Sequence, residues 1–408
     1  MTTFMTVEQA KGSVRQLEKI CTIRATGENL YNLAKCYFIL GDLASALPLA
    51  EEAFSRDPHN PSFSTGLGLI LKDLGEHQAA HDAFKVAYEV ADEDPFVRLC
   101  YSESLLRQGK WLEAWPIWDD TRSTREASAL IVGLPIQVRL WNGKSSVEEL
   151  LVTEEGGIGD RITYCRWLPK LDEMKIKWKF FPFPELRGFF ERASWCGPSK
   201  LVGPGDPASA SHWTTTHSLP VIFGATPNTV PDLPKDTFRP LPKFTLKYKL
   251  AAGRKLPIAG ICWQGDESRH GGRKVHSLSE GQAMRLVCKT DHLVHWVNLN
   301  YDRALPKPVE NPKMQTWEEL AGLMDNLDLI VSVETGPMCL ADAMRKSLIV
   351  LLSSNSDWRF LEDGASPFYP NARLIRNGPG GGLENAIDKT IEAIEFQYKK
   401  PALHVVGV

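Results

Sequence analysis

Small and apolar residues recur every 34 residues along the first third of the chain. The period appears in five columns: Gly41, Gly75 and Gly109; Ala46, Ala80 and Ala114; Ala50, Phe84 and Trp118; Leu33, Leu67 and Tyr101; Ala34, Gly68 and Ser102. A fixed period of this length predicts stacked helical hairpins, each of which buries its apolar face against its neighbours. Small residues mark the close crossing of two helices, and glycine ends the first helix of each hairpin.

We expect three such repeats of the tetratricopeptide type, at residues 27–60, 61–94 and 95–125, after a lead-in helix at 7–21. The first repeat pairs helices at 30–40 and 43–56. Pro58, Pro61 and Pro95 fall where helices should stop or start. Because repeats contact mainly their neighbours, we expect a fragment that begins near Leu134 to stay soluble.

The pattern changes after residue 135 to strand, glycine loop and helix, which is the unit of a parallel sheet. Residues 149–153 predict a buried strand, 154–160 a loop, and a helix starts near Asp160. A second strand is expected at 177–183. No elements are placed in the Pro-, Gly-, Ser- and Thr-rich segment 197–243, and 239–256 resembles a linker.

A second α/β half follows, with expected strands at 257–263, 292–298, 327–333 and 348–352. Its helices are expected at 279–289, 316–324, 338–345 and 384–399. The predicted fold class is therefore α + α/β: repeats at 1–130, a first half at 131–250 and a second half at 251–408. Two such halves place a ligand cleft at the carboxyl ends of their strands.

Composition limits the classes of function. The chain has 408 residues, a net charge of -3 and eight cysteines without metal-type spacing, so we expect an ordinary cytoplasmic protein with reduced thiols and no bound metal. No stretch is apolar and long enough to span a bilayer, and the first residues show no signal core. The sequence lacks the motifs of four enzyme classes: zinc proteases, P-loop enzymes, nucleophile-elbow hydrolases and ordinary NAD enzymes.

Four segments carry candidate chemistry, and each has a purely structural alternative. The loop GGIGD (156–160) and the turn ETGP (334–337) both precede helices, where free amides bind anions or are simply capped. The basic loop 264–277 suits a diphosphate, or is a solvated surface loop. The segment SNSDWRF (354–360) grips a nucleobase or sugar, or anchors a loop by stacking and an ion pair.

The motifs together resemble one family. The chain is similar to the ADP-heptose heptosyltransferases in the order and spacing of its motifs. These motifs are LWNGK, EEGGIGDRITYCRWLP, GICWQGD with HGGRKVHSL, LDLIVSVETGPMCLADAM and SDWRFLEDGASPFYP. A more distant similarity is to the O-linked N-acetylglucosamine transferases, in which helical repeats also precede the transferase domain. The resemblance covers about residues 27–395. The chain departs from the family at two positions. Glu334 stands where the family usually has aspartate, and Cys339 stands where it commonly has histidine.

The resemblance implies a GT-B fold with Rossmann-like halves, an acceptor side in the first half and a nucleotide-sugar side in the second. It implies an inverting, metal-independent glycosyltransferase of a phage or bacterium, with a nucleotide sugar as co-substrate and no other cofactor. Asp160 is the expected general base, and the next candidates are Glu154 and Glu155. Gly156, Gly157 and Gly159 form its loop. The expected donor-binding residues are Trp263, Gly265, Arg273, Lys274, His276, Glu334, Thr335, Gly336, Pro337, Asp357, Trp358 and Arg359.

The acceptor stays open among a protein side chain, a glycan and a hydroxylated base in phage DNA. A different class of function is also open: a scaffold that binds a protein partner in the repeat groove and carries an inactive transferase domain. Tyr31, Tyr37 and Trp111 fit either partner contacts or helical core, and core is favoured by their helical spacing. Binding of a nucleotide sugar distinguishes the two functions.

Overall fold

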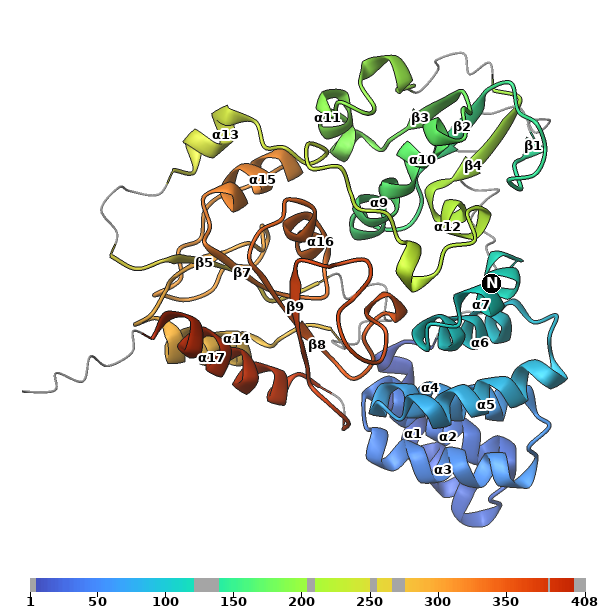
Figure 1. Ribbon diagram of the computed structural model, residues 1–408. Coiled ribbons are helices and arrows are strands. Elements are labelled where there is room, and N and C mark those ends of the chain that lie inside the picture. Colours follow the sequence, from blue (N-terminus) through green and yellow to red (C-terminus); the bar gives the residue numbers. More distant parts are fainter. Residues whose placement is uncertain are drawn as a thin grey trace, which may run out of the picture.

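The structure is a computed structural model, and it describes residues 5–120, 139–203, 210–249, 255–265, 276–380 and 382–399. The expected domain boundaries near 130 and 250 fall outside these residues. Figure 1 shows three parts: a stack of helices, a first α/β unit and a second α/β unit. The α + α/β class predicted from the sequence is confirmed by these elements.

The helical stack contains the predicted repeats. Each first helix ends at or just before a glycine in the left-handed region: φ is 81° at Gly41, 85° at Gly75 and 77° at Gly109. Where two helices cross, a side chain at Gly68 would meet the ring of Phe84 at 2.5 Å, which explains the small residue in that column. The helices are α1 (Val7–Ile23), α2 (Gly27–Leu40), α3 (Leu43–Arg56), α4 (Pro61–Leu74), α5 (His77–Val90), α6 (Pro95–Arg107) and α7 (Trp111–Asp120).

The first α/β unit is a four-stranded parallel sheet in the order β1-β4-β2-β3. Its strands are β1 (Arg139–Leu140), β2 (Leu150–Thr153), β3 (Trp178–Phe181) and β4 (His212–Thr215). Its helices are α9 (Ile158–Tyr164), α10 (Leu168–Glu173), α11 (Pro184–Arg192) and α12 (Leu219–Ile222). β4 lies in the segment where no element was predicted. The expected linker holds a short helix, α13 (Pro242–Lys247), so that interpretation was incomplete.

The second α/β unit is a five-stranded parallel sheet in the order β6-β5-β7-β8-β9. Its strands are β5 (Ile258–Cys262), β6 (His295–Asn298), β7 (Leu329–Val333), β8 (Leu348–Leu352) and β9 (Ala372–Arg376). β9 was not predicted. The helices are α14 (Glu280–Thr290), α15 (Trp317–Asp325), α16 (Gly336–Ala343) and α17 (Glu384–Tyr398). Buried side chains of α14 and α17 form one core with one face of the sheet.

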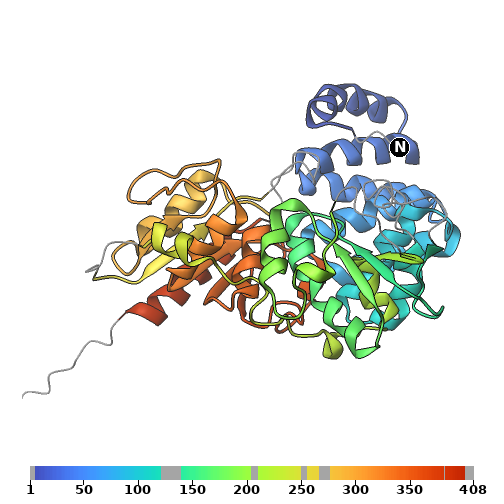
Figure 2. The same cartoon turned by 90° about the horizontal axis from the view of Figure 1, so that it is seen from above.

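The last repeat hairpin packs into a hydrophobic core that it shares with both α/β units. The ring of Trp111 lies 5.5 Å from Trp358 and 5.6 Å from Phe368, centroid to centroid. The indole N–H of Trp115 donates to the carbonyl of Ala225 at 2.7 Å. Figures 1 and 2 show this end of the stack lying against the α/β units. The last hairpin therefore contacts the α/β units as well as its neighbouring repeat, a contact that the repeat pattern did not predict.

Other expectations from the sequence are settled by burial. Trp111 is in the core, and Tyr31 packs against Phe63 at a centroid distance of 5.3 Å, as favoured. All eight cysteines are free thiols, and only Cys288 is exposed. Among the described helices, none has both the length and the apolar character that a membrane span requires.

Candidate active site

Asp160 lies in the first turn of α9 and closes the glycine loop that follows β2. The helix begins at Ile158, two residues earlier than predicted, with Gly157 as its N-cap and Asp160 as its third residue. Asp160 Oδ2 accepts the N–H of Gly157 at 2.9 Å. Gly156 has a φ of 76°, and a side chain there would meet Asp160 Oδ2 at 2.6 Å, so the loop requires glycine.

The starts of α9 and α16 lie side by side across the two α/β units. A side chain at Gly159 would meet Cys339 Sγ at 3.1 Å and the Cα of Gly336 at 3.4 Å. Glycine at 159 thus permits the close approach of two helix N-termini, each of which presents free amides and positive dipole charge. The structure therefore brings together the two loops that the sequence singled out separately, GGIGD and ETGP.

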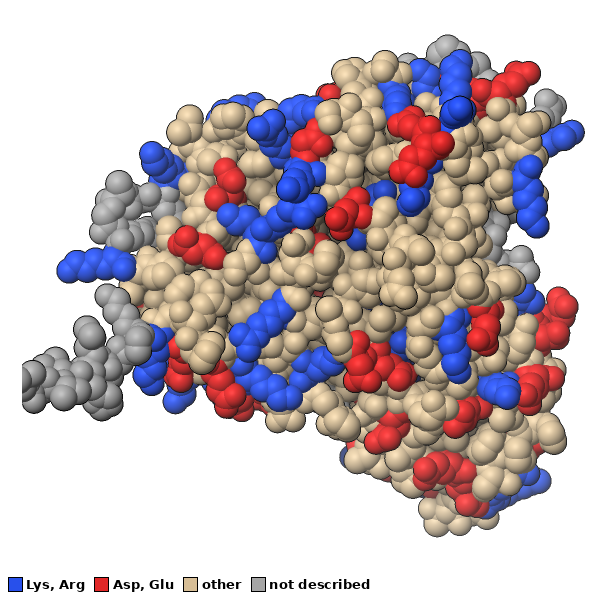
Figure 3. Space-filling view, in the orientation of Figure 1, with Lys and Arg blue, Asp and Glu red and all other residues tan. Residues whose placement is uncertain are grey.

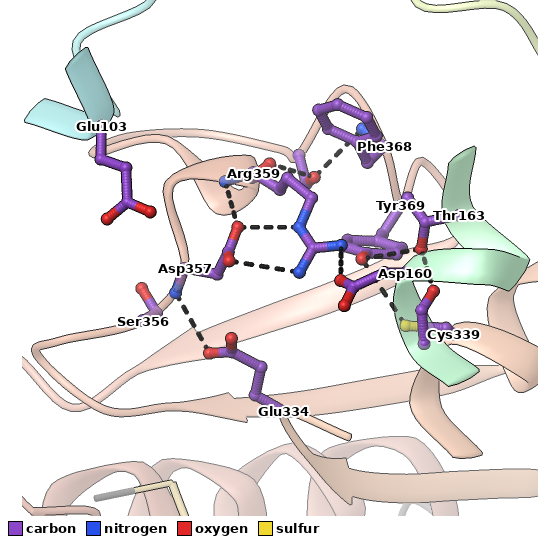
Figure 4. A network of polar contacts seen from close by, with 12 residues as sticks. Glu103, Asp160, Thr163, Glu334, Cys339, Ser356, Asp357, Arg359, Phe368 and Tyr369 are labelled. Carbon is purple, nitrogen blue, oxygen red and sulfur yellow. Dashed lines mark hydrogen bonds and ion pairs between the residues drawn. The ribbon is translucent and has the colours of Figure 1, made fainter. Parts of the chain in front are cut away.

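Arg359 joins Asp160 to the turn after β8. Its Nη1 donates to Asp160 Oδ1 at 2.9 Å, and its Nε donates to Asp357 Oδ1 at 2.8 Å. Figure 4 shows the guanidinium between the two carboxylates. Burial alone would raise the pKa of Asp357, yet the Arg359 guanidinium holds that pKa below its ordinary value. Asp357 is therefore charged at neutral pH.

Glu334 lies on the far side of Asp357 from Arg359, as Figure 4 shows. Its Oε2 accepts the backbone N–H of Asp357 at 3.2 Å and lies 3.6 Å from His276 Nδ1. Burial, and then the neighbouring Asp357 charge, raise the pKa of Glu334. Burial also lowers the pKa of His276 to about 4. Glu334 and His276 thus meet as neutral groups and not as a charged pair.

The other expected donor-binding residues are distributed around the start of α16. Thr335 is the N-cap of α16, Gly336 and Pro337 form its first turn, and a side chain at Gly265 would meet Thr335 at 3.2 Å. Trp263 is 4% exposed at the end of β5. Arg273 and Lys274 lie outside the described residues, so their expected role stays a prediction.

Trp358 anchors its loop by packing against other aromatic rings, as the structural alternative for the segment 354–360 predicted. It stands in the 3₁₀ turn Trp358–Phe360, is 5% exposed, and packs edge-on against Trp111, Trp115 and Trp118. One edge of this residue also lines a cavity between the repeats and the second α/β unit. The same segment therefore anchors the repeats and faces a cavity.

Several residues near the site were not predicted from the sequence. Tyr369 Oη lies 3.1 Å from Thr163 Oγ1 and 3.6 Å from Cys339 Sγ, so Cys339 is buried beside a phenol. His217 stacks on Tyr164 with a centroid distance of 3.9 Å. His217 lies in the segment without predicted elements, and no motif marked it.

Glu154 and Glu155, the next candidates for a base, are both buried. Glu154 Oε2 accepts the N–H of Phe183 at 2.8 Å, and burial raises the pKa of Glu154 to about 8. Glu154 is therefore protonated at neutral pH, whereas a base must be ionised. Within the described ranges, no group of three His, Cys, Asp or Glu side chains is placed to hold a metal ion.

No family model and no curated protein matches the sequence. Among solved structures, a crystal structure of MamA matches at 17% identity over 30% of this chain and 72% of that chain, with a TM-score of 0.27. ADP-heptose lps heptosyltransferase II of E. coli matches at 12% identity over 61% of this chain and 99% of that chain, with a TM-score of 0.42. E. coli heptosyltransferase WaaC with ADP matches at 13% identity over 60% and 99%, with a TM-score of 0.38. Heptosyltransferases, the family that the sequence resembles, are thus among the matched structures, and at these scores the matches assign no role to any residue.

Proposed function

We propose that this chain is a glycosyltransferase, which moves a sugar from a nucleotide-sugar donor to an acceptor hydroxyl. The observation that carries the proposal is the position of Asp160 beside the start of α16, with Gly159 against Gly336. A carboxylate suits removal of a proton from a hydroxyl, and free helix amides suit the departing phosphates. The two requirements of this transfer are thus met by adjacent groups from different α/β units.

In the proposed reaction Asp160 takes the proton of the acceptor hydroxyl while the oxygen attacks the anomeric carbon. The bond between that carbon and the phosphate oxygen breaks, and the nucleoside diphosphate leaves with the bonding electrons. Arg359 holds Asp160 in place through the ion pair between its Nη1 and Asp160 Oδ1. A single displacement of this kind inverts the anomeric configuration.

We also propose that the reaction needs no metal and no cofactor besides the nucleotide sugar. The amides at the start of α16 and the side-chain cations around it would neutralise the leaving group. Treatment with a chelator should then leave the rate unchanged, and NMR of the product should show the inverted anomer. Rate loss on chelation, restored by a divalent cation, would contradict metal independence.

The acceptor remains a proposal among the three hydroxyl-bearing classes. Figure 3 shows Lys and Arg side chains interspersed with Asp and Glu over the face drawn there, without a continuous basic track. Because long DNA contacts depend on neutralised phosphates, this face favours a protein or glycan acceptor over extended duplex DNA. Part of the last hairpin is covered by the second α/β unit, since Arg107 of α6 and Trp111 of α7 contact Ser356 and Trp358; a partner on the other repeats stays the alternative.

Two measurements test the proposed function. Calorimetry with UDP-, GDP-, ADP- and CMP-linked sugars should find a donor, and failure of all four would favour the scaffold. With the donor known, Asp160→Asn should keep the hydrogen bond from Gly157 and lower transfer by at least about 10²-fold at near-normal donor affinity. Glu173→Gln, an exposed carboxylate on α10 whose partner is Lys170, is the matched control and should transfer normally.

A further inference from the structure

A cavity of about 220 Å³ lies between the repeats and the second α/β unit. The repeats contribute Lys72 from α4, His77 and Phe84 from α5, and Glu103 and Arg107 from α6; the second unit contributes His276, Glu334, Asp357 and Trp358. Four expected donor-binding residues thus share one cavity with residues from another part of the chain. No sequence motif connected Lys72 or Arg107 with the donor.

Arg107 is a buried cation at the closed end of this cavity. It is 5% exposed, and its Nη2 donates to the backbone carbonyl of Ser356. Among the described residues, no carboxylate lies within ion-pair distance of its guanidinium. Arginine stays protonated in proteins, and a buried charge whose partner is a neutral carbonyl is costly. An anion in the cavity would offset that cost.

Lys72 and Arg107 are the two cations that line the cavity, and its carboxylates are Glu103, Glu334 and Asp357. After burial, the charges of Lys72 and Arg107 are among the causes that lower the pKa of His77 and of His276, each to about 4. Both histidines are therefore neutral at neutral pH. Lys72 Nζ has one carboxylate nearby, Glu103 at 3.6 Å, and that pair lies at the more exposed side. Asp357 is paired with Arg359, a cation that it shares with Asp160.

We propose that Arg107 and Lys72 bind the phosphates of the nucleotide donor in this cavity, so that the repeat array completes the donor site. This inference rests on the proposed function. Pockets for whole ligands usually measure roughly 300–1,000 Å³, so a cavity of about 220 Å³ fits one charged end of a nucleotide sugar. Glu334 lines the cavity and is followed directly by Thr335, the cap of α16. Phosphates here would therefore also lie near the helix start.

The test uses the full chain and calorimetry with pyrophosphate, with UDP, GDP and ADP, and with the corresponding nucleosides. Arg107→Gln should raise the Kd for pyrophosphate and for the bound nucleotide by about 10- to 100-fold, the effect of one lost charge-assisted hydrogen bond. Affinity for a nucleoside, which has no phosphate, should not change. Arg56→Gln is the matched control, because Arg56 is an exposed arginine of the repeats, paired with Glu52.

Lys72→Gln covers the case in which Arg107→Gln fails to fold. Lys72 is partly exposed, so its loss should leave the melting temperature nearly unchanged while the Kd for phosphate ligands rises. If the wild type binds a nucleotide and both variants bind it equally well, the inference is overturned and the proposed function stands. If the wild type binds none of these nucleotides and none of the UDP-, GDP-, ADP- and CMP-linked sugars, the proposed function fails. A third outcome is that the protein binds glucuronate in a manner that depends on Arg107 but does not bind pyrophosphate. The ligand of the cavity would then be a sugar carboxylate and not a phosphate, which would contradict the proposal.

Discussion

Arg359 donates a hydrogen bond to Asp160 at 2.9 Å, and this ion pair joins the second α/β unit to the first. The two side chains are only 12% and 17% exposed, so solvent screens their attraction less than at the surface. The same guanidinium also binds Asp357. One cation therefore fixes the position of the proposed base and neutralises a carboxylate that lines the cavity.

Replacing Arg359 tests this shared dependence. Arg359→Gln leaves two poorly exposed carboxylates without their cation, so we expect a loss of about 3 kcal/mol in the free energy of unfolding and a fall in transfer. Arg285→Gln, which breaks an exposed pair with Glu384, should cost less than about 1 kcal/mol. Chemical denaturation of both variants makes the comparison, and equal losses would contradict a special role for the buried pair.

A double-mutant cycle tests whether Asp160 and Arg359 act together. The costs of Asp160→Asn and Arg359→Gln should not add, because either change breaks the same ion pair. The coupling should be at least about 0.5 kcal/mol in stability and should also appear in the transfer rate. Strictly additive effects in both measurements would show that the pair is incidental.

Removal of the repeats should expose a large apolar surface. A fragment beginning near residue 134 loses the three tryptophans that cover Trp358, together with the Trp111 ring against Phe368. Exposed apolar patches of this kind promote aggregation, so we expect poor solubility and no nucleotide binding by the fragment. Recovery of a soluble monomer that binds donor with wild-type affinity would contradict both this expectation and the proposed role of Arg107.

Two glycine-to-alanine substitutions, at Gly68 and at Gly12, distinguish the effect of packing on stability from the effect of helix propensity. Gly68→Ala places a methyl group 2.5 Å from the buried Phe84 ring, and the overpacking should outweigh the gain in propensity, for a net loss of about 1–2 kcal/mol. Gly12→Ala meets nothing within 4 Å in α1 and should gain about 0.5–1 kcal/mol. Thermal melts of the two variants should therefore shift in opposite directions.

The sequence predicted the elements whose signals are local. The 34-residue period identified the repeats, because each hairpin reproduces the same crossing of Gly68 or its equivalents against the next helix. The buried runs of β2, β5, β7 and β8 were found because both faces of a parallel strand are covered, so they are continuously apolar. The loops at 156–160 and 334–337 were found because they directly follow such strands.

The remaining elements and contacts depend on long-range packing. β4 has the sequence HWTT, and its two threonines are buried and pair with Val152 and Thr153 of β2. β9 alternates in exposure at the sheet edge and lacks an apolar run. The cavity could not be predicted, because the approach of Arg107 to Ser356 joins positions 249 residues apart. No pattern within one segment carries that information.

The last prediction concerns Glu154, the buried residue that directly follows β2. Its carboxyl group has an ordinary pKa of 4.5, and burial raises that pKa to about 8 in the folded chain. Between these values the folded protein holds the proton while the unfolded chain has released it. The unfolded state therefore binds fewer protons, and the stability that Glu154 contributes is full below pH 4.5 and is lost as the pH rises through about 8.

Glu154→Gln should remove this dependence. Glutamine keeps an oxygen that accepts the N–H of Phe183 and does not ionise. Between about pH 5 and about pH 9 the wild type should lose stability relative to the variant. The free energy of unfolding of the variant minus that of the wild type should therefore rise by on the order of 3 kcal/mol over this range. Denaturation at both pH values measures it, with Glu173→Gln as control, since that exposed carboxylate is solvated in both states. A difference independent of pH would mean that Glu154 is ionised in the folded chain, and it would return this residue to the candidates for a general base.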